Sequence, residues 1–383
     1  MCQVCNRLKS WCTDRDIYRS WVNMRGKREL FMLITGAVLF IFDLVTDIVL
    51  ATRYGHKGEY WWFGFTLLFI IVPLFIVNFM ALGQSDDSSW ELLSFCSMFV
   101  CSSIFVRYVQ EINYWKQTHW DNPPCGDNYK ECNCPDCEQY RVAITTSNKS
   151  AYSLARVRYV ETLTESAPQW CLQVYIMLRQ WDFPWLTVLS TGISLLSLAW
   201  SITALEKARA NKNSHNFTLP VTVVFFTSQL FNLLSRLLAI AAFAYVFKEH
   251  LFTALAVRFL MVYVWLSWGN KCKCDDVVRS AVAGTVVNIL LMLHVPNMFT
   301  KEFSSPRTAQ FVLDSLISVQ SVLFAILAVT IPIPDVKHMS VLRPIVLSLV
   351  IVGVVLGTIF LIVYNKLFTP TEELHEPNEE ENV

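Results

Sequence analysis

Acidic and amide side chains recur at every fourth position of one largely apolar stretch, Y-V-E-T-L-T-E-S-A-P-Q-W-C-L-Q. They are Glu161, Glu165, Gln169 and Gln173. In a helix, four residues turn about 400°, so this spacing predicts a polar stripe that winds slowly around the axis. Pro168 stands within the stripe, and proline kinks a helix. We expect a bent polar staircase.

Other ionisable or amide side chains interrupt further apolar stretches. Asp43 and Asp47 lie four residues apart, and therefore on one face of a helix. Arg236 lies deep in another stretch, and Asp314 and Gln320 interrupt one near the C-terminus. A charge at the centre of a bilayer costs about 3 kcal/mol even on a mild insertion scale. Because Arg236 cannot lose its proton, we expect it to pair with Asp47, or failing that with Asp43.

Two interpretations of these side chains stay open. They could form buried ion pairs that only fix helix packing, or they could line a route for polar groups through a membrane. The second interpretation is favoured, because the side chains span several depths and both halves of the chain. One structural ion pair would not need a staircase.

The stretch C-G-D-N-Y-K-E-C-N-C-P-D-C gathers four of the twelve cysteines. They are Cys125, Cys132, Cys134 and Cys137. Four thiolates can hold one zinc ion in a tetrahedron, although this spacing fits no standard zinc finger. If the stretch faced an oxidising compartment, two disulfides would be the alternative. A structural zinc ion is the one cofactor that the sequence suggests.

The sequence argues against an enzyme and against a nucleic-acid-binding protein. It contains no P-loop, G-x-S-x-G or H-E-x-x-H motif. Lys and Arg number 31, and Asp and Glu also number 31, so no net positive charge would attract nucleic acid.

Composition indicates a membrane protein. Hydrophobic residues make up 54% of the chain and charged residues 16%, against about 25% charged residues in soluble domains. Ten segments approach the roughly 20 apolar residues that a spanning helix needs. They are 30–51, 60–82, 89–112, 157–178, 184–205, 219–247, 250–268, 277–299, 311–331 and 341–368. None shows the strict alternation of a transmembrane β-strand. The predicted fold class is an all-α polytopic membrane protein.

Positive charge predicts the topology. The basic tail 1–29 and the basic linker 206–217 should be cytosolic. The Cys-rich loop 113–157 also carries Lys and Arg, which places both ends of 89–112 on the cytosolic side and makes that segment re-entrant. Segment 277–299 takes the equivalent place later in the chain. We therefore expect eight transmembrane helices plus two re-entrant helices in two pseudo-repeated halves, 30–205 and 218–368. The acidic tail 369–383 follows, and both termini should be cytosolic.

Several motifs resemble one family in collinear order. E-T-L-T-E-S-A-P-Q-W-C-L-Q-V-Y-I (161–176) is similar to the E-x-x-x-E-S-A-P-Q-L-x-L-Q-x-Y-I signature of the XK-related proteins. D-L-V-T-D-I-V-L-A-T-R-Y (43–54), G-E-Y-W-W (58–62), F-V-L-D (311–314) and V-Y-N-K-L-F-T-P (363–370) also match. The resemblance covers nearly all of the chain outside the two tails and the Cys-rich loop.

This resemblance implies a plasma-membrane phospholipid scramblase. Such a protein moves lipids between leaflets without ATP and exposes phosphatidylserine in apoptotic cells. The staircase and the other intramembrane charges would then lie along the lipid pathway, and Trp62 would be an aromatic gate at the outer end of the second span. The alternative is a membrane adaptor that recruits a bulk lipid-transfer protein without scrambling alone.

The resemblance also implies partners and a trigger. Some relatives need a single-span chaperone, others associate with a lipid-transfer protein, and caspase cleavage of a tail activates some of them. Here the tail after Pro370 contains no Asp, which leaves Asp14 and Asp16 as the candidate cleavage sites. We expect the intact chain to be closed.

Overall fold

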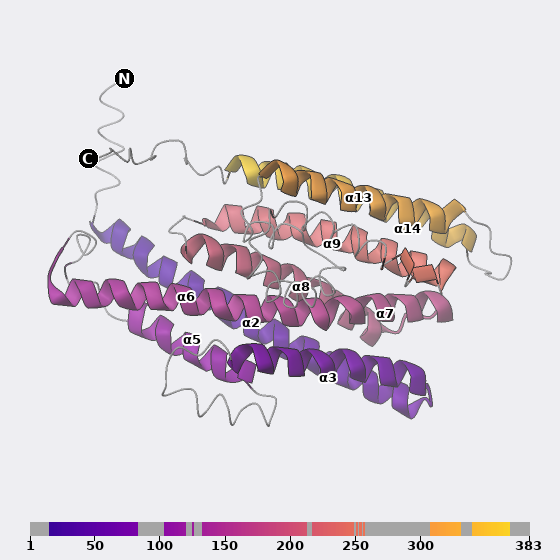
Figure 1. Ribbon diagram of the computed structural model, residues 1–383, viewed down its shortest axis with the longest axis horizontal. Coiled ribbons are helices and arrows are strands. Elements are labelled where there is room, and N and C mark those ends of the chain that lie inside the picture. Colours follow the sequence, from indigo (N-terminus) through magenta and orange to yellow (C-terminus); the bar gives the residue numbers. More distant parts are fainter. Residues whose placement is uncertain are drawn as a thin grey trace, which may run out of the picture.

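The computed structural model describes residues 15–82, 103–119, 125, 132–212, 217–248, 250–251, 253–254, 256, 307–330 and 339–367. Nine long helices account for most of these residues. They are α2 (Arg15–His56), α3 (Tyr60–Leu82), α5 (Ser103–His119), α6 (Pro135–Thr164), α7 (Ser166–Gln180), α8 (Trp185–Lys212), α9 (Leu219–Phe247), α13 (Arg307–Thr330) and α14 (Met339–Leu367). Figure 1 shows them side by side along the long axis, with α13 and α14 at one edge and α3 and α5 at the other.

Besides a buried apolar core, the helices carry exposed apolar side chains and buried polar ones. On α2, Phe42 is 57% exposed, whereas the neighbouring Asp43 is 3% exposed and Asp47 is fully buried. This inversion is expected where the surroundings are hydrocarbon, because polar groups must then find their partners inside the protein.

The predicted fold class is confirmed. Five described helices are long and apolar enough to cross a membrane, namely Glu29–His56, Tyr60–Val77, Trp185–Lys212, Leu219–Phe247 and Arg343–Leu367. The number of eight spans stays a prediction. Residues 83–102, which include most of the expected re-entrant segment 89–112, and the whole of 277–299 lie outside the described residues.

The predicted bend in the polar staircase is confirmed. α6 ends at Thr164 and α7 begins at Ser166, with Glu165 between them at φ −102° and ψ −69°. Pro168 lacks an N–H group, and its ring would clash with the carbonyl of Thr164 one turn earlier. The helix therefore breaks just before the proline.

Helices replace most of the expected loop 113–157. α5 continues to His119, and α6 already begins at Pro135, long before the predicted span at 157. Pro135 suits the first turn of a helix, and Asp136 and Glu138 favour the same turn because they face the positive end of the helix dipole. A search for apolar stretches misses such a polar helical extension.

Small residues allow α9 and α14 to pack closely in the second half. The Ser228 hydroxyl donates a hydrogen bond to the carbonyl of Gly357 over 2.8 Å. A Cβ atom built on Gly357 would lie 2.3 Å from Oδ1 of Asn232, and one on Gly353 would lie 2.9 Å from Cβ of Ser235. Glycines four residues apart commonly permit this close approach in membrane helices.

Candidate functional site

Two acidic residues of α2, Asp43 and Asp47, face α7 and α8. Asp43 accepts hydrogen bonds from the hydroxyls of Ser166 and Ser194, each at 2.6 Å. One turn further along α2, Asp47 accepts hydrogen bonds from the Gln173 amide at 3.1 Å and from the Ser190 hydroxyl at 3.0 Å. The prediction that both acids share one helical face is therefore confirmed.

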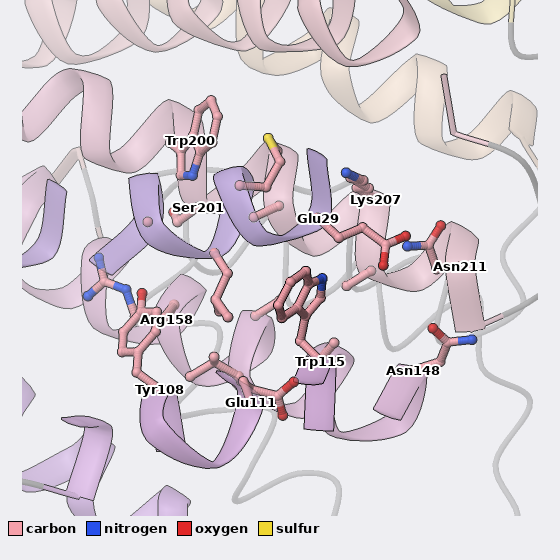
Figure 2. Close-up of a pocket in the computed structure, with 18 of the residues that line it drawn as sticks. Glu29, Tyr108, Glu111, Trp115, Asn148, Arg158, Trp200, Ser201, Lys207 and Asn211 are labelled. Atoms are coloured by element: carbon pink, nitrogen blue, oxygen red, sulfur yellow. The ribbon is translucent and has the colours of Figure 1, made fainter. Parts of the chain in front are cut away.

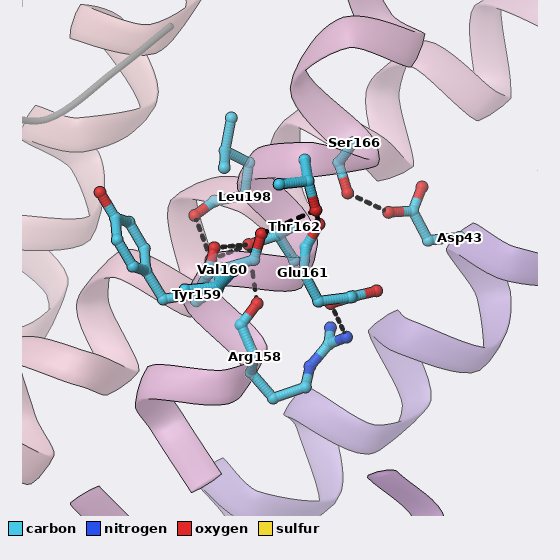
Figure 3. Close-up of polar contacts among 10 residues, drawn as sticks. Asp43, Arg158, Tyr159, Val160, Glu161, Thr162, Ser166 and Leu198 are labelled. Atoms are coloured by element: carbon cyan, nitrogen blue, oxygen red, sulfur yellow. Dashed lines mark hydrogen bonds and ion pairs between the residues drawn. The ribbon is translucent and has the colours of Figure 1, made fainter. Parts of the chain in front are cut away.

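A buried ion pair extends this polar cluster along α6. The Arg158 guanidinium donates to the carboxylate of Glu161 and lies 4.5 Å above the centre of the Phe40 ring. Figure 3 shows this pair beside the Asp43–Ser166 hydrogen bond. All of these side chains lie at the junction of α2, α6 and α7.

The middle of the staircase carries unsatisfied polar atoms. Glu165 is 1% exposed and Gln169 is fully buried. Among the described residues, neither the Glu165 carboxylate oxygens nor the Gln169 amide atoms have a hydrogen-bond partner of normal geometry. An unsatisfied buried polar group costs about 1–3 kcal/mol, so these two side chains are suited to receive water or a passing polar group.

We call this buried row of polar side chains the polar seam. Its members are Asp43, Asp47, Arg158, Glu161, Glu165, Ser166, Gln169, Gln173, Ser190 and Ser194. The structure thus brings together the four staircase residues and both acids of α2.

A cavity of about 150 Å³ continues the seam between α2, α5, α6 and α8. Arg158 belongs to both, since it lines the cavity and contacts Glu161. Figure 2 shows Glu29, Lys207 and Asn211 together at the end of the cavity away from Arg158. Along α8, the seam and cavity run from Ser190 to Asn211, about 30 Å of helix, which matches the hydrocarbon core of a bilayer.

Apolar side chains close the opposite end of the seam. Leu50, Tyr54 and Ile176 form a buried cluster one turn beyond Asp47 and Gln173, and Trp62 packs against it. We call these four residues the apolar plug. The Trp62 ring lies 5.9 Å from the Tyr175 ring and 5.9 Å from the Arg179 guanidinium. Trp62 thus lies where a gate is expected, and its gating role stays a prediction.

The predicted pairing of Arg236 is wrong. Arg236 is buried on α9, but the hydrogen bonds of Asp47 go to Gln173 and Ser190, and those of Asp43 go to serines. The cation that faces the acids is Arg158 instead. Arg236 and Asp47 were expected to pair because they lie at similar depths in their apolar segments. α8, however, packs against both α2 and α9 and lies between them (Figure 1).

The remaining predicted residues lie away from the seam or outside the described side chains. Gln320 is half-buried on α13, which packs against α9 and α14. The backbone of Asp314 belongs to α13 and that of Asp16 to α2, but their side chains are not among those described. Asp14 lies outside the described residues altogether.

Sequence reasoning missed Arg158 and the serines of the seam. Arg158 stands three residues before Glu161, a spacing that brings two helical side chains into contact. On α8 the serines recur every three or four residues and so share one face. The serines are Ser190, Ser194, Ser197 and Ser201. Both spacings could have indicated the site.

The four clustered cysteines meet at the start of α6. Their sulfur atoms all lie within 4.8 Å of one another. The backbone N–H of Cys137 lowers the pKa of the Cys134 thiol to about 7. This arrangement could hold a metal ion, and it lies apart from the residues of the seam.

Comparisons with known proteins agree with the resemblance seen in the sequence. XK-related protein 9 of Tetraodon nigroviridis is 23% identical over 365 residues, which cover 90% of this chain and 91% of that protein. The endoplasmic reticulum membrane adapter protein XK of Pan troglodytes is 23% identical over 278 residues, which cover 68% of this chain and 62% of that protein. The family model for XK-related protein matches residues 31–370. The chain is therefore a multi-pass membrane protein of the XK-related family.

Proposed function

We propose that this protein is an ATP-independent phospholipid scramblase of the plasma membrane, which exposes phosphatidylserine during apoptosis. The observation that carries the proposal is the polar seam and its cavity, which together extend about 30 Å along α8. A lipid headgroup needs a polar path of this length to change leaflets, because the hydrocarbon core is about 30 Å thick.

The chemistry of the path suits a zwitterionic or anionic headgroup. Lys207 at the end of the cavity and Arg158 at its junction with the seam can contact the phosphate, and Asp43 and Asp47 can contact the ammonium group. Serine hydroxyls both donate and accept hydrogen bonds, so they can serve either group. The acyl chains would stay in the bilayer, beside the exposed apolar face of α2.

In this proposal the described conformation is closed. The seam is polar as far as Asp47, and the apolar plug follows immediately. A headgroup that entered from the cavity would lose its hydrogen bonds there, at a cost of several kcal/mol. A trigger must therefore displace the plug, and caspase cleavage at Asp14 or Asp16 is the trigger that the family resemblance suggests.

The test measures lipid movement in proteoliposomes that hold the purified full-length chain and a fluorescent phospholipid. A membrane-impermeant reductant quenches the fluorescent lipid that it can reach. Three samples are compared in this way: the intact chain, a variant without residues 1–14, and Trp62→Ala. We expect at least one of the two variants to make the inner-leaflet lipid accessible. Protection equal to that of empty liposomes in all three samples would refute the proposal.

Seam variants connect lipid movement to the path. In the active form, Ser190→Ala and Ser194→Ala should slow scrambling, because each removes a hydroxyl that bonds to an acid of α2. Ser321→Ala is the matched control, since among the described residues this buried hydroxyl bonds to Ile317 of its own helix α13 and to no acid. Equal scrambling in all three variants would place the lipid path elsewhere.

A second candidate function is favoured by the name of one relative, the endoplasmic reticulum membrane adapter protein XK. In this alternative, the chain recruits a bulk lipid-transfer protein and does not scramble alone, with or without a single-span chaperone. The two functions predict different results in the same experiment. An adaptor would not scramble lipid in any purified form and would co-purify with a lipid-transfer protein from cells. Fluorescence imaging of cells would find the two proteins in the same membrane.

A further inference from the structure

The Cys-rich stretch places four thiol groups around one point. Cys125 and Cys132 have sulfur atoms 3.5 Å apart, and those of Cys125 and Cys134 are 3.6 Å apart. Cys137 completes the group and is fully buried, and all four sulfur atoms lie within 4.8 Å of one another. Cys125 lies in a turn, Cys132 and Cys134 precede α6, and Cys137 lies in its first turn, so the cluster is not the result of a single regular helix.

These separations match a metal site and do not match disulfides. Tetrahedral zinc binds sulfur at about 2.3 Å, which places neighbouring sulfur atoms roughly 3.8 Å apart. A disulfide would hold two sulfur atoms about 2.05 Å apart, and all four thiols are free. We propose that Cys125, Cys132, Cys134 and Cys137 bind one structural Zn²⁺ ion.

The surroundings can stabilise the charge of such a site. Four thiolates and one Zn²⁺ carry a net charge of about −2. Cys134 and Cys137 lie at the N-terminus of α6, where the helix dipole favours negative charge. The Arg141 guanidinium donates a hydrogen bond to the carbonyl of Cys132 at 3.0 Å, which brings a positive charge beside the ligands.

The zinc site lies beside a contact between two helices that both reach the cavity. Tyr140, on the first turns of α6, donates a hydrogen bond to the carbonyl of Thr118 at the end of α5 over 3.0 Å. Trp115 of α5 and Arg158 of α6 line the cavity. The ion would thus hold the start of α6 beside its contact with α5, at one end of the helices that form the cavity. This inference does not depend on lipid scrambling.

The test counts zinc in the full-length protein, purified in detergent without chelators and quantified by elemental mass spectrometry. We expect about one zinc ion per wild-type chain. Cys134→Ser and Cys137→Ser should each lower the zinc content about tenfold. The matched control is Cys171→Ser, because Cys171 lies on α7, away from the cluster, and its thiol donates to the carbonyl of Leu237. This variant should keep its zinc.

The wild-type measurement decides the question even if the variants fail to fold. Wild-type protein with no more zinc than the buffer background would overturn the proposal. Free thiols can also be alkylated in intact cells and the peptides analysed by mass spectrometry. If these four cysteines were found paired as disulfides, that result would also overturn the proposal. As an independent check, protein grown with Co²⁺ in place of Zn²⁺ should show the visible absorption of tetrahedral cobalt thiolates, and Cys125→Ser should weaken it.

Discussion

Replacing Arg158 by Leu should destabilise the protein more than any other single change in the polar seam. The Arg158 side chain is buried, pairs with Glu161 and covers the ring of Phe40. Leucine removes the positive charge but leaves the carboxylate of Glu161 in place. Asp43 and Glu165 lie close enough to interact electrostatically with the same guanidinium, so they also lose a favourable neighbour.

The structure permits an estimate of the loss. Breaking a buried ion pair from one side costs about 3–5 kcal/mol, because the other charge is left without a partner. Total folding free energies are only about 5–15 kcal/mol. At roughly 2–4 °C per kcal/mol, the apparent unfolding temperature of Arg158→Leu should fall by about 10 °C.

A double mutant separates the ion pair from simple packing. In Arg158→Leu/Glu161→Gln neither charge remains, so we expect most of the lost stability to return. Lys149→Leu is the control, because Lys149 is an exposed cation of the same helix α6. Its unfolding temperature should change little. Thermal unfolding of the detergent-solubilised protein, followed by size-exclusion chromatography, compares Arg158→Leu, Glu161→Gln, the double mutant and the control with wild type.

Two results would contradict this reasoning. Arg158→Leu could unfold at the wild-type temperature, which would mean that the carboxylate of Glu161 needs no cation. Alternatively, the losses of the two single mutants could simply add in the double mutant. Additive losses would show that the two side chains act on stability independently.

Three further predictions concern packing, topology and gating. Gly357→Ala should lower the free energy of unfolding by about 1–3 kcal/mol, because its Cβ atom would lie 2.3 Å from Oδ1 of Asn232. Gly192→Ala is the control in the same thermal assay, because a Cβ atom on Gly192 meets nothing within 4 Å. Asn148, in the sequon Asn-Lys-Ser on α6, should stay unglycosylated in cells if the polar first half of α6 is cytosolic; a glycosidase-sensitive mobility shift would disprove that topology. Trp62→Ala should speed lipid movement in proteoliposomes several-fold by loosening the apolar plug, and an unchanged rate would remove Trp62 from the gate.

Periodicity in the sequence identified the shared faces but not their partners. The four-residue spacing placed Glu161 to Gln173 on one winding stripe, and the structure buries that stripe as predicted. The spacing of Asp43 and Asp47 was equally informative, since both acids face the same neighbours. These inferences needed only helical geometry.

Which side chains of different helices pair with one another cannot be predicted from one segment alone. The expected pair of Arg236 with Asp47 rested on equal depth in two apolar segments. Depth fixes one coordinate of a side chain, whereas contact also depends on which face each helix turns toward the other and on which helices are neighbours. α8 lies between the two helices concerned, and its serines occupy the positions facing the acids.

Hydropathy also underestimated one helical region, because it measures only apolar length. α6 and α7 together run from Pro135 to Gln180, whereas the apolar segment expected from the sequence covers only 157–178. The first half of α6 is polar, so a search for apolar stretches does not detect it. Its contacts with α5, such as the hydrogen bond from Tyr140 to Thr118, involve a second segment, which a window along one segment cannot include.

The order of residue types along the seam bears on how the proposed scramblase would open. The ion pair of Arg158 and Glu161 lies near the cavity, Asp43 and Asp47 follow with their hydroxyl and amide partners, and the apolar plug comes last. A headgroup would therefore find polar partners until it passes Asp47, and the largest barrier should lie at Leu50 and Ile176. Opening then needs only a movement of α2 or α3 against α7 that separates the plug, while the hydrogen bonds of the seam persist. A trigger that acts on the helical extension of α2 before Glu29 would act on the same rigid element that carries both Asp47 and Leu50.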